Sequence, residues 1–130
     1  MSTSFPPRGY ETILLVEDED LVRVLARDVL RNNGYTVLEA RDGADAMGVA
    51  VSHRGTIHLL ITDLVMPNMG GQEVAVSLAP LLGEMKVLFM SGYTDDAIIR
   101  HGILRPGAQF LQKPFRIDAF LRKVREVLDG

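Results

Sequence analysis

The chain has 130 residues, of which 47% are hydrophobic and 24% charged, with a formal net charge of −3 and no cysteine. This length and composition predict one compact domain, and they exclude disulfide scaffolds, thiolate metal sites and cysteine nucleophiles. Nucleic-acid binding is not expected of a mildly acidic chain, and the apolar runs are too short to span a membrane, so we expect a cytoplasmic domain without membrane contact.

Short apolar runs alternate with helical patterns along the whole chain. In chain order the expected elements are strand Thr12–Val16, helix Leu21–Asn33, strand Tyr35–Glu39, helix Ala44–Ser52, strand Ile57–Thr62, helix Gln72–Leu78, strand Lys86–Met90, helix Ala97–His101, strand Gln109–Leu111 and helix Ile117–Leu128. Gly34 is expected to stop the first helix, Asp42 to cap the second, and Pro80 to end the third.

These elements form five successive strand–helix units. Strands that are apolar without alternation are typical of a parallel sheet covered by helices on both faces. The pattern therefore predicts an α/β fold with an open, doubly wound sheet, because five units are too few for an eight-stranded barrel. Residues 11–129 are expected to be the domain, and residues 1–10 a linker or the edge of an excised segment.

Chemistry in such a sheet is expected outside the carboxyl ends of the strands. Glu17 and Asp18 follow the first predicted strand, Asp63 the third, Ser91 the fourth and Lys113 the fifth. Clustered carboxylates repel one another unless a cation joins them, and oxygen ligands suit Mg²⁺. The pattern predicts that Asp63 attacks a phosphoryl group, while Lys113 and Ser91 hold its remaining oxygens.

Each of these residues also has a simpler interpretation. The acidic residues after the first strand could stabilise only the N-terminus of the next helix. A strand that ends in aspartate also holds magnesium in nucleotide-binding proteins, but the chain contains neither glycine-rich phosphate-binding motif. The joint occurrence of the polar residues at four strand ends favours phosphoryl chemistry.

Four segments, ILLVEDED, LLITDLVMPNMGG, VLFMSGYTDD and FLQKPF, resemble the signature segments of response-regulator receiver domains of two-component signalling. The resemblance covers residues 11–129 and implies a flavodoxin-like (βα)5 sheet with strand order 2-1-3-4-5. It implies that Asp63 is the phosphoacceptor. It also implies a Mg²⁺ site made by Glu17, Asp18, Asp63 and the backbone carbonyl of Val65.

The resemblance assigns the conformational switch to Ser91 and Phe110, and phosphate binding to Lys113. Three positions differ from the commoner residues of the family. Glu17 replaces the commoner Asp and is one methylene longer. Ser91 replaces Thr, and Phe110 replaces Tyr and has no hydroxyl.

The implied partner is a sensor histidine kinase or a histidine phosphotransfer domain, and the implied chemistry is limited to self-catalysed phosphorylation and dephosphorylation. The amino-acid sequences of these motifs are similar to those of receivers at the C-terminal end of hybrid sensor histidine kinases. Two alternatives remain. A small aspartyl phosphohydrolase typically needs an acid where Val65 stands, and a pseudo-receiver that binds without phosphorylation would be expected to lack Asp63 or Lys113.

The first predicted helix carries apolar residues over an arc of roughly 180°, wider than the ~100° of an ordinary core-facing stripe. They are Leu21, Val22, Leu25, Ala26, Val29 and Leu30, with Val24 outside the arc. Either the helix is deeply packed against the sheet, or part of the stripe is exposed for docking a phosphotransfer helix bundle or the dimerisation helices of a kinase.

Overall fold

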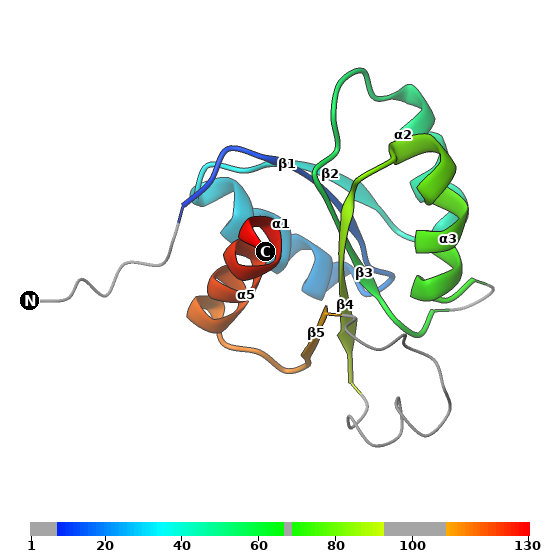
Figure 1. Cartoon of the computed structure of the whole chain (residues 1–130). Coiled ribbons are helices and arrows are strands. Elements are labelled where there is room, and N and C mark those ends of the chain that lie inside the picture. Colours follow the sequence, from blue (N-terminus) through cyan, green and yellow to red (C-terminus); the bar gives the residue numbers. More distant parts are fainter. Residues whose placement is uncertain (1–7, 67–68, 93–108) are drawn as a thin grey trace, which may run out of the picture.

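The computed structural model describes residues 8–66, 69–92 and 109–130. Five parallel strands form one sheet in the order β2-β1-β3-β4-β5 (Figure 1). Their bounds are β1 Thr12–Val16, β2 Thr36–Ala40, β3 Leu59–Asp63, β4 Lys86–Ser91 and β5 Gln109–Gln112. The prediction of a flavodoxin-like α/β fold is confirmed, and each strand lies within two residues of its predicted bounds.

Helices cover both faces of this sheet. In the described residues they are α1 Asp20–Asn32, α2 Gly43–Ser52, α3 Gly71–Leu82 and α5 Ile117–Asp129. Figure 1 shows α1 and α5 on one side of the strands and α2 and α3 on the other. The predicted helix Ala97–His101 lies outside the described residues. None of the described helices has the length and apolarity needed to cross a bilayer.

The central strands are uniformly apolar because they have no solvent-facing side. In β1, Ile13 and Leu15 belong to the core beneath α1 and α5, whereas Leu14 and Val16 belong to the core beneath α2 and α3. All four side chains are fully buried. Complete burial of such a side chain contributes on the order of 1.5–3 kcal/mol, so the two helical layers fix the register of the central strands.

Local signals set most of the helix ends. Gly34 has a φ of 100°, and the carboxylate of Asp42 accepts a hydrogen bond from the Asp45 N–H at 2.8 Å, as predicted for a stop and a cap. The helix α3 continues to Leu82, four residues beyond its predicted end at Leu78 and two beyond Pro80. Pro80 lies in the last turn, where it removes only one hydrogen bond and the helix ends soon afterwards.

Gly71 brings the start of α3 directly against the end of β3. A Cβ atom at this position would lie 2.3 Å from the carbonyl oxygen of Asp63, which no side chain tolerates. The Gly71 N–H donates to the Leu64 carbonyl at 2.9 Å. This close backbone approach fixes the segment after β3, and therefore the position of Asp63.

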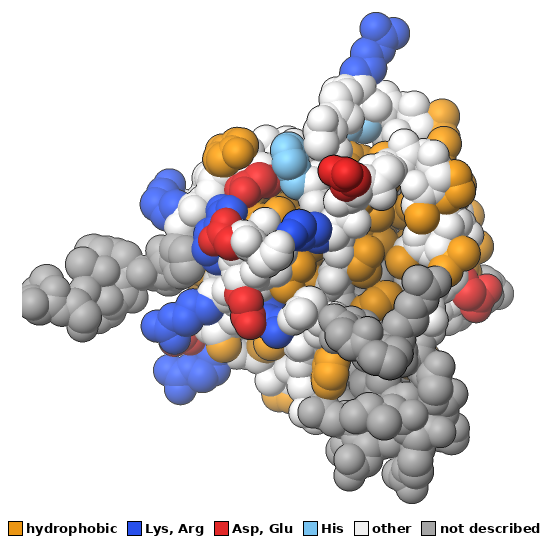
Figure 2. Space-filling view, in the orientation of Figure 1, with side chains coloured by type: hydrophobic (Ala, Val, Ile, Leu, Met, Phe, Trp, Pro, Cys, Tyr) orange, Lys and Arg blue, Asp and Glu red, His pale blue; other side chains and the backbone are white. Residues whose placement is uncertain are grey.

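At the opposite end of the sheet, an ion-pair network joins the start of the described chain to α5. The Arg125 guanidinium donates to both carboxylate oxygens of Glu11, at 2.6 and 3.0 Å, and to Asp129 at 2.7 Å. Charged side chains gather over this part of the surface in Figure 2. Glu11 is only 6% exposed, so its pairing with Arg125 is a buried, bidentate one.

Glu11→Gln should destabilise the protein in a pH-dependent way. The hydrogen bonds from Arg125 lower the pKa of Glu11 from 4.5 to about 2. A lowered pKa stabilises the fold above pH 4.5, and this contribution is lost as the pH falls toward 2; the shift corresponds to about 3 kcal/mol. Urea unfolding at pH 7 and pH 3 should show a large difference between wild type and variant that shrinks at the lower pH.

The matched control is Asp129→Asn, which removes the exposed partner of the same arginine. Exposed pairs contribute at most about 1 kcal/mol, so this variant should change the unfolding free energy little. An effect of Glu11→Gln that is equal at both pH values would contradict the ion-pair explanation.

Candidate functional site

The polar residues predicted at the strand ends lie together at the carboxyl edge of the sheet. Asp63 is the last residue of β3, Glu17 follows β1 and Lys113 follows β5. The Lys113 Nζ lies 2.8 Å from a carboxylate oxygen of Glu17 and 3.2 Å from one of Asp63. One ammonium group therefore joins two carboxylates that lie 46 residues apart along the chain.

Glu17 is held in place by its backbone as well as by its side chain. Its N–H donates to the Ala40 carbonyl at 3.1 Å, and its carboxylate accepts the N–H of Glu19 at 3.0 Å. The side chain is fully buried, whereas the neighbouring Asp18 is exposed. The loop thus directs Glu17 into the protein and leaves Asp18 at the surface.

Three carboxylates meet in this loop region. Glu17, Asp18 and Asp63 each offer an oxygen atom, and these atoms lie within 4.8 Å of one another. An all-oxygen donor set with one exposed member fits a hard divalent cation that keeps several water molecules, as Mg²⁺ does. The predicted metal ligands are therefore brought together, except that the carbonyl role of Val65 stays a prediction.

Burial governs the electrostatics of the cluster. It raises the pKa of Glu17 to about 7 against the opposing effect of Lys113, and it also raises the pKa of Asp63. Burial alone would lower the pKa of Lys113, but hydrogen bonding to Glu17 and the charge of Asp63 raise it overall. Lys113 stays charged, and a cation bound beside it would favour the ionised forms of the buried carboxylates.

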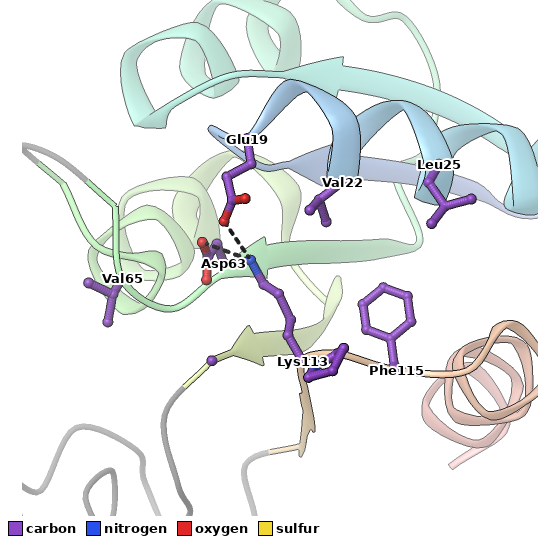
Figure 3. A pocket seen from close by; sticks show the side chains of 9 residues that line it. Glu19, Val22, Leu25, Asp63, Val65, Lys113 and Phe115 are labelled. Carbon is purple, nitrogen blue, oxygen red and sulfur yellow. Dashed lines mark hydrogen bonds and ion pairs between the residues drawn. The ribbon is translucent and has the colours of Figure 1, made fainter.

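A cleft of about 660 Å³ opens over Asp63. Its lining combines a polar floor with an apolar wall: Glu19, Val22, Leu25, Asp63, Val65, Gly92, Lys113, Pro114 and Phe115. Figure 3 shows Lys113 reaching toward Asp63 and Glu19, with Val22 and Leu25 of α1 on one side and Phe115 on another. Asp63 therefore lies at the floor of a cleft with one apolar side.

The two predicted switch residues lie on neighbouring strands. Ser91, at the end of β4, is 1% exposed, and its carbonyl accepts the Lys113 N–H at 2.7 Å. Phe110 of β5 pairs in register with Phe89 and packs, half-buried, against Phe89 and Leu64. Ser91 thus lies at the edge of the site, whereas Phe110 lies in a separate apolar cluster beside it.

Sequence reasoning did not identify three residues around the site. Glu19 lies 3.9 Å from Lys113, Phe115 lines the cleft, and Arg23 donates to the Glu17 carbonyl at 2.9 Å. The acidic run Glu17–Asp20 could have indicated Glu19. Nothing in the local pattern distinguishes Arg23 from the other arginines of α1, because its role depends on how the helix lies against the loop.

A parallel five-stranded sheet that brings three carboxylates and one lysine to its carboxyl edge is the arrangement expected of a phosphoacceptor signalling domain. The response regulator receiver domain family matches residues 13–125. The chain therefore belongs to this family, and the resemblance of its four motifs is confirmed.

Relatives and solved structures agree with this assignment. The chain is 36% identical over 121 residues to sensor kinase CckA of Brucella abortus and 34% identical over 117 residues to response regulator MprA of Mycobacterium ulcerans. These matches cover 93% and 89% of the chain but only 13% and 49% of the two relatives.

The crystal structure of the receiver domain from the hybrid histidine kinase CckA is 40% identical, with a TM-score of 0.76 over 90% of this chain and 98% of that one. A chemotaxis protein of Vibrio cholerae, CheY4, is 25% identical, with a TM-score of 0.78 over 92% and 99%. The chain is a receiver domain of two-component signalling, similar to the receiver of a hybrid kinase.

Proposed function

We propose that Asp63 accepts a phosphoryl group from a phosphohistidine of a partner protein, in a reaction that depends on Mg²⁺. The observation that carries this proposal is the position of Asp63 at the floor of an open cleft, 3.2 Å from the Lys113 ammonium and within reach of two further carboxylates. We also propose residues 11–129 as the unit that performs it.

Glu17, Asp18 and Asp63, with the Val65 carbonyl, would hold the metal. When bound, Mg²⁺ supplies positive charge that offsets repulsion between the carboxylates and the incoming phosphoryl oxygens. An Asp63 carboxylate oxygen attacks phosphorus, a P–O bond forms, and the P–N bond to the donor imidazole breaks. Lys113, already in contact with Asp63, then pairs with a phosphoryl oxygen.

Incubation with acetyl phosphate and Mg²⁺, followed by intact mass measurement, tests this function against its alternatives. A receiver gains the mass of one phosphoryl group, mapped to the peptide that contains Asp63. A pseudo-receiver stays unmodified, and a phosphohydrolase releases phosphate over many turnovers without retaining a label. Val65, an apolar residue, stands where such a hydrolase carries its second acid, which favours the receiver.

We propose that the partner is a sensor histidine kinase or a histidine phosphotransfer domain and that it docks over α1. Leu21 is 87% exposed and Leu25 50% exposed, so the stripe is not fully packed against the sheet. Val22, Leu25 and Phe115 form the apolar wall of the cleft, which suits a helix that presents phosphohistidine to Asp63. NMR titration with a phosphotransfer domain should place the largest chemical-shift changes at these residues.

Histidine kinases and phosphotransfer domains donate the phosphoryl group in the cytoplasm, so we propose a cytoplasmic location for this domain.

Phosphorylation is expected to act on Phe110 through Ser91. A phosphoryl oxygen on Asp63 should attract the Ser91 hydroxyl, which would let the half-buried Phe110 ring pack more deeply. Full burial of a phenylalanine contributes about 1.5–3 kcal/mol, and only part of this is gained here. That is still enough to shift a two-state equilibrium severalfold.

Aromatic NMR of the wild type with and without beryllofluoride should therefore show a change at Phe110 that Ser91→Ala removes. Ser91→Thr is the matched control, since it keeps the hydroxyl and should keep the change. A Phe110 signal that responds identically in the wild type and Ser91→Ala would show that the hydroxyl plays no part.

A further inference from the structure

We infer that Arg23 of α1 is a positioning residue for the metal site: it holds the loop that carries Glu17 and Asp18, and thereby sets the affinity of the site for Mg²⁺. The inference rests on the proposed function of this loop. In the described residues, the Arg23 side chain contacts neither the carboxylates of the proposed metal ligands nor the lining of the cleft.

The guanidinium of Arg23 makes three different contacts at once. One Nη donates to the backbone carbonyl of Glu17 at 2.9 Å, the other donates to Asp20 at 2.7 Å, and Nε lies 3.5 Å from a carboxylate oxygen of Glu39. The side chain is only 11% exposed. An arginine buried to this degree, with its donors in a fixed plane, holds its partners in a defined geometry.

The other contacts of Glu17 are made by its N–H, which donates to Ala40, and by its carboxylate, which accepts from the Glu19 N–H and from Lys113. In the part of the chain that the structure describes, Arg23 is the group that holds the Glu17 carbonyl. The N-cap residue of α1, Glu19, makes no side-chain capping hydrogen bond. The Glu17 carbonyl belongs to the peptide group that joins Glu17 to Asp18, so the hydrogen bond from Arg23 acts on the orientation of that group. Loss of the guanidinium frees the Glu17 carbonyl, and with it the peptide plane that leads into Asp18.

Mg²⁺ is sensitive to such a change because it requires near-octahedral oxygen geometry. Glu17 and Asp18 are adjacent in sequence yet contribute from opposite sides, one buried and one exposed. The rotation of the peptide between them therefore decides whether both oxygens face the same ion.

Glu39 of the edge strand β2 pairs with Arg23 and also with Arg27, which serves as the control position. Its carboxylate lies 3.2 Å from Arg27 and 4.0 Å from Arg31, besides its contact with Arg23. Arg27, one turn after Arg23, pairs with Asp28 and Glu39 and has no contact with the Glu17–Glu19 loop in the part of the chain that the structure describes. Arg27→Met therefore removes the same charge from the same helix without touching the loop.

The test is a titration of the unphosphorylated protein with Mg²⁺ alone, followed through backbone amide shifts of residues 17–19 and 63–65. Arg23→Met should raise the Kd about tenfold, in the range seen when a residue that orients a metal ligand is lost. Arg23→Lys should recover part of this, and Arg27→Met should change the Kd by less than about twofold.

A second readout separates positioning from general loss of structure. With acetyl phosphate, Arg23→Met should need more Mg²⁺ to reach half-maximal rate but should approach the wild-type rate at saturating Mg²⁺. Merely weakened folding would instead lower the rate at every Mg²⁺ concentration. If Arg23→Met does not fold, Glu39→Gln, which releases the guanidinium from one side, should still weaken Mg²⁺ binding.

Equal Mg²⁺ affinity in wild type, Arg23→Met and Glu39→Gln would overturn the inference while leaving the proposed function intact. A wild type that binds no Mg²⁺ would overturn both, and the two results are distinguished by the wild-type titration itself.

Discussion

Asp63→Asn should abolish phosphorylation by acetyl phosphate, with a loss of at least about a thousandfold in rate, because the amide is not a nucleophile. The stability of the folded protein should not decrease. Burial raises the pKa of Asp63, so its charge disfavours folding at neutral pH, and removal of that charge relieves repulsion among the three carboxylates. Intact mass and peptide mapping measure the first effect, and thermal unfolding measures the second.

Asp45→Asn is a suitable control for this variant. Asp45 is an exposed aspartate in the first turn of α2, away from the cleft lining, and its replacement should leave labelling unchanged. A stable label of unchanged stoichiometry in Asp63→Asn would place the phosphoacceptor elsewhere and refute the proposed role.

Asp18→Ala should reduce the phosphorylation rate by about 100-fold or more, because it removes the one exposed carboxylate of the metal cluster. We expect the fold to tolerate the change, since the Asp18 side chain is exposed. Measurement of the rate over a Mg²⁺ series should show that added metal restores little of it. Wild-type rates for Asp18→Ala in excess Mg²⁺ would rule out a metal role for this residue.

Glu17→Asp is the informative partner of this variant. It keeps the carboxylate and restores the acid that is commoner in the family, so phosphorylation should persist. It also shortens the side chain that meets Lys113 at 2.8 Å, so the contact between the two should lengthen. Persistence of labelling in Glu17→Asp together with its loss in Asp18→Ala would support oxygen ligation.

The fold was predictable because its signals are local. An uninterrupted apolar run such as Leu59–Ile61 indicates burial on both faces, and the Asp42 cap and the Gly34 stop each depend on neighbours in sequence. The carboxyl edge of a parallel sheet then brings the strand ends together, so the placement of Asp63 beside Lys113 could be predicted from their positions alone. The predicted end of α3 was too early, because a proline in the last turn of a helix removes only one backbone hydrogen bond.

The sequence by itself therefore determined the order of elements, a doubly wound parallel sheet and the acidic and basic residues of the site, while the strand order followed from the resemblance to receiver domains. Only the tertiary structure decided which atoms meet: that Lys113 pairs with Glu17 as well as Asp63, that Leu21 and Leu25 stay exposed, and that Arg23 holds the Glu17 carbonyl. The physical reason is that helix caps, helix stops and the periodicity of apolar residues depend on neighbours along the chain, whereas the exposure of a given side chain depends on the elements that pack over it. A long charged side chain likewise takes the partner that the packing of distant elements brings within hydrogen-bonding distance.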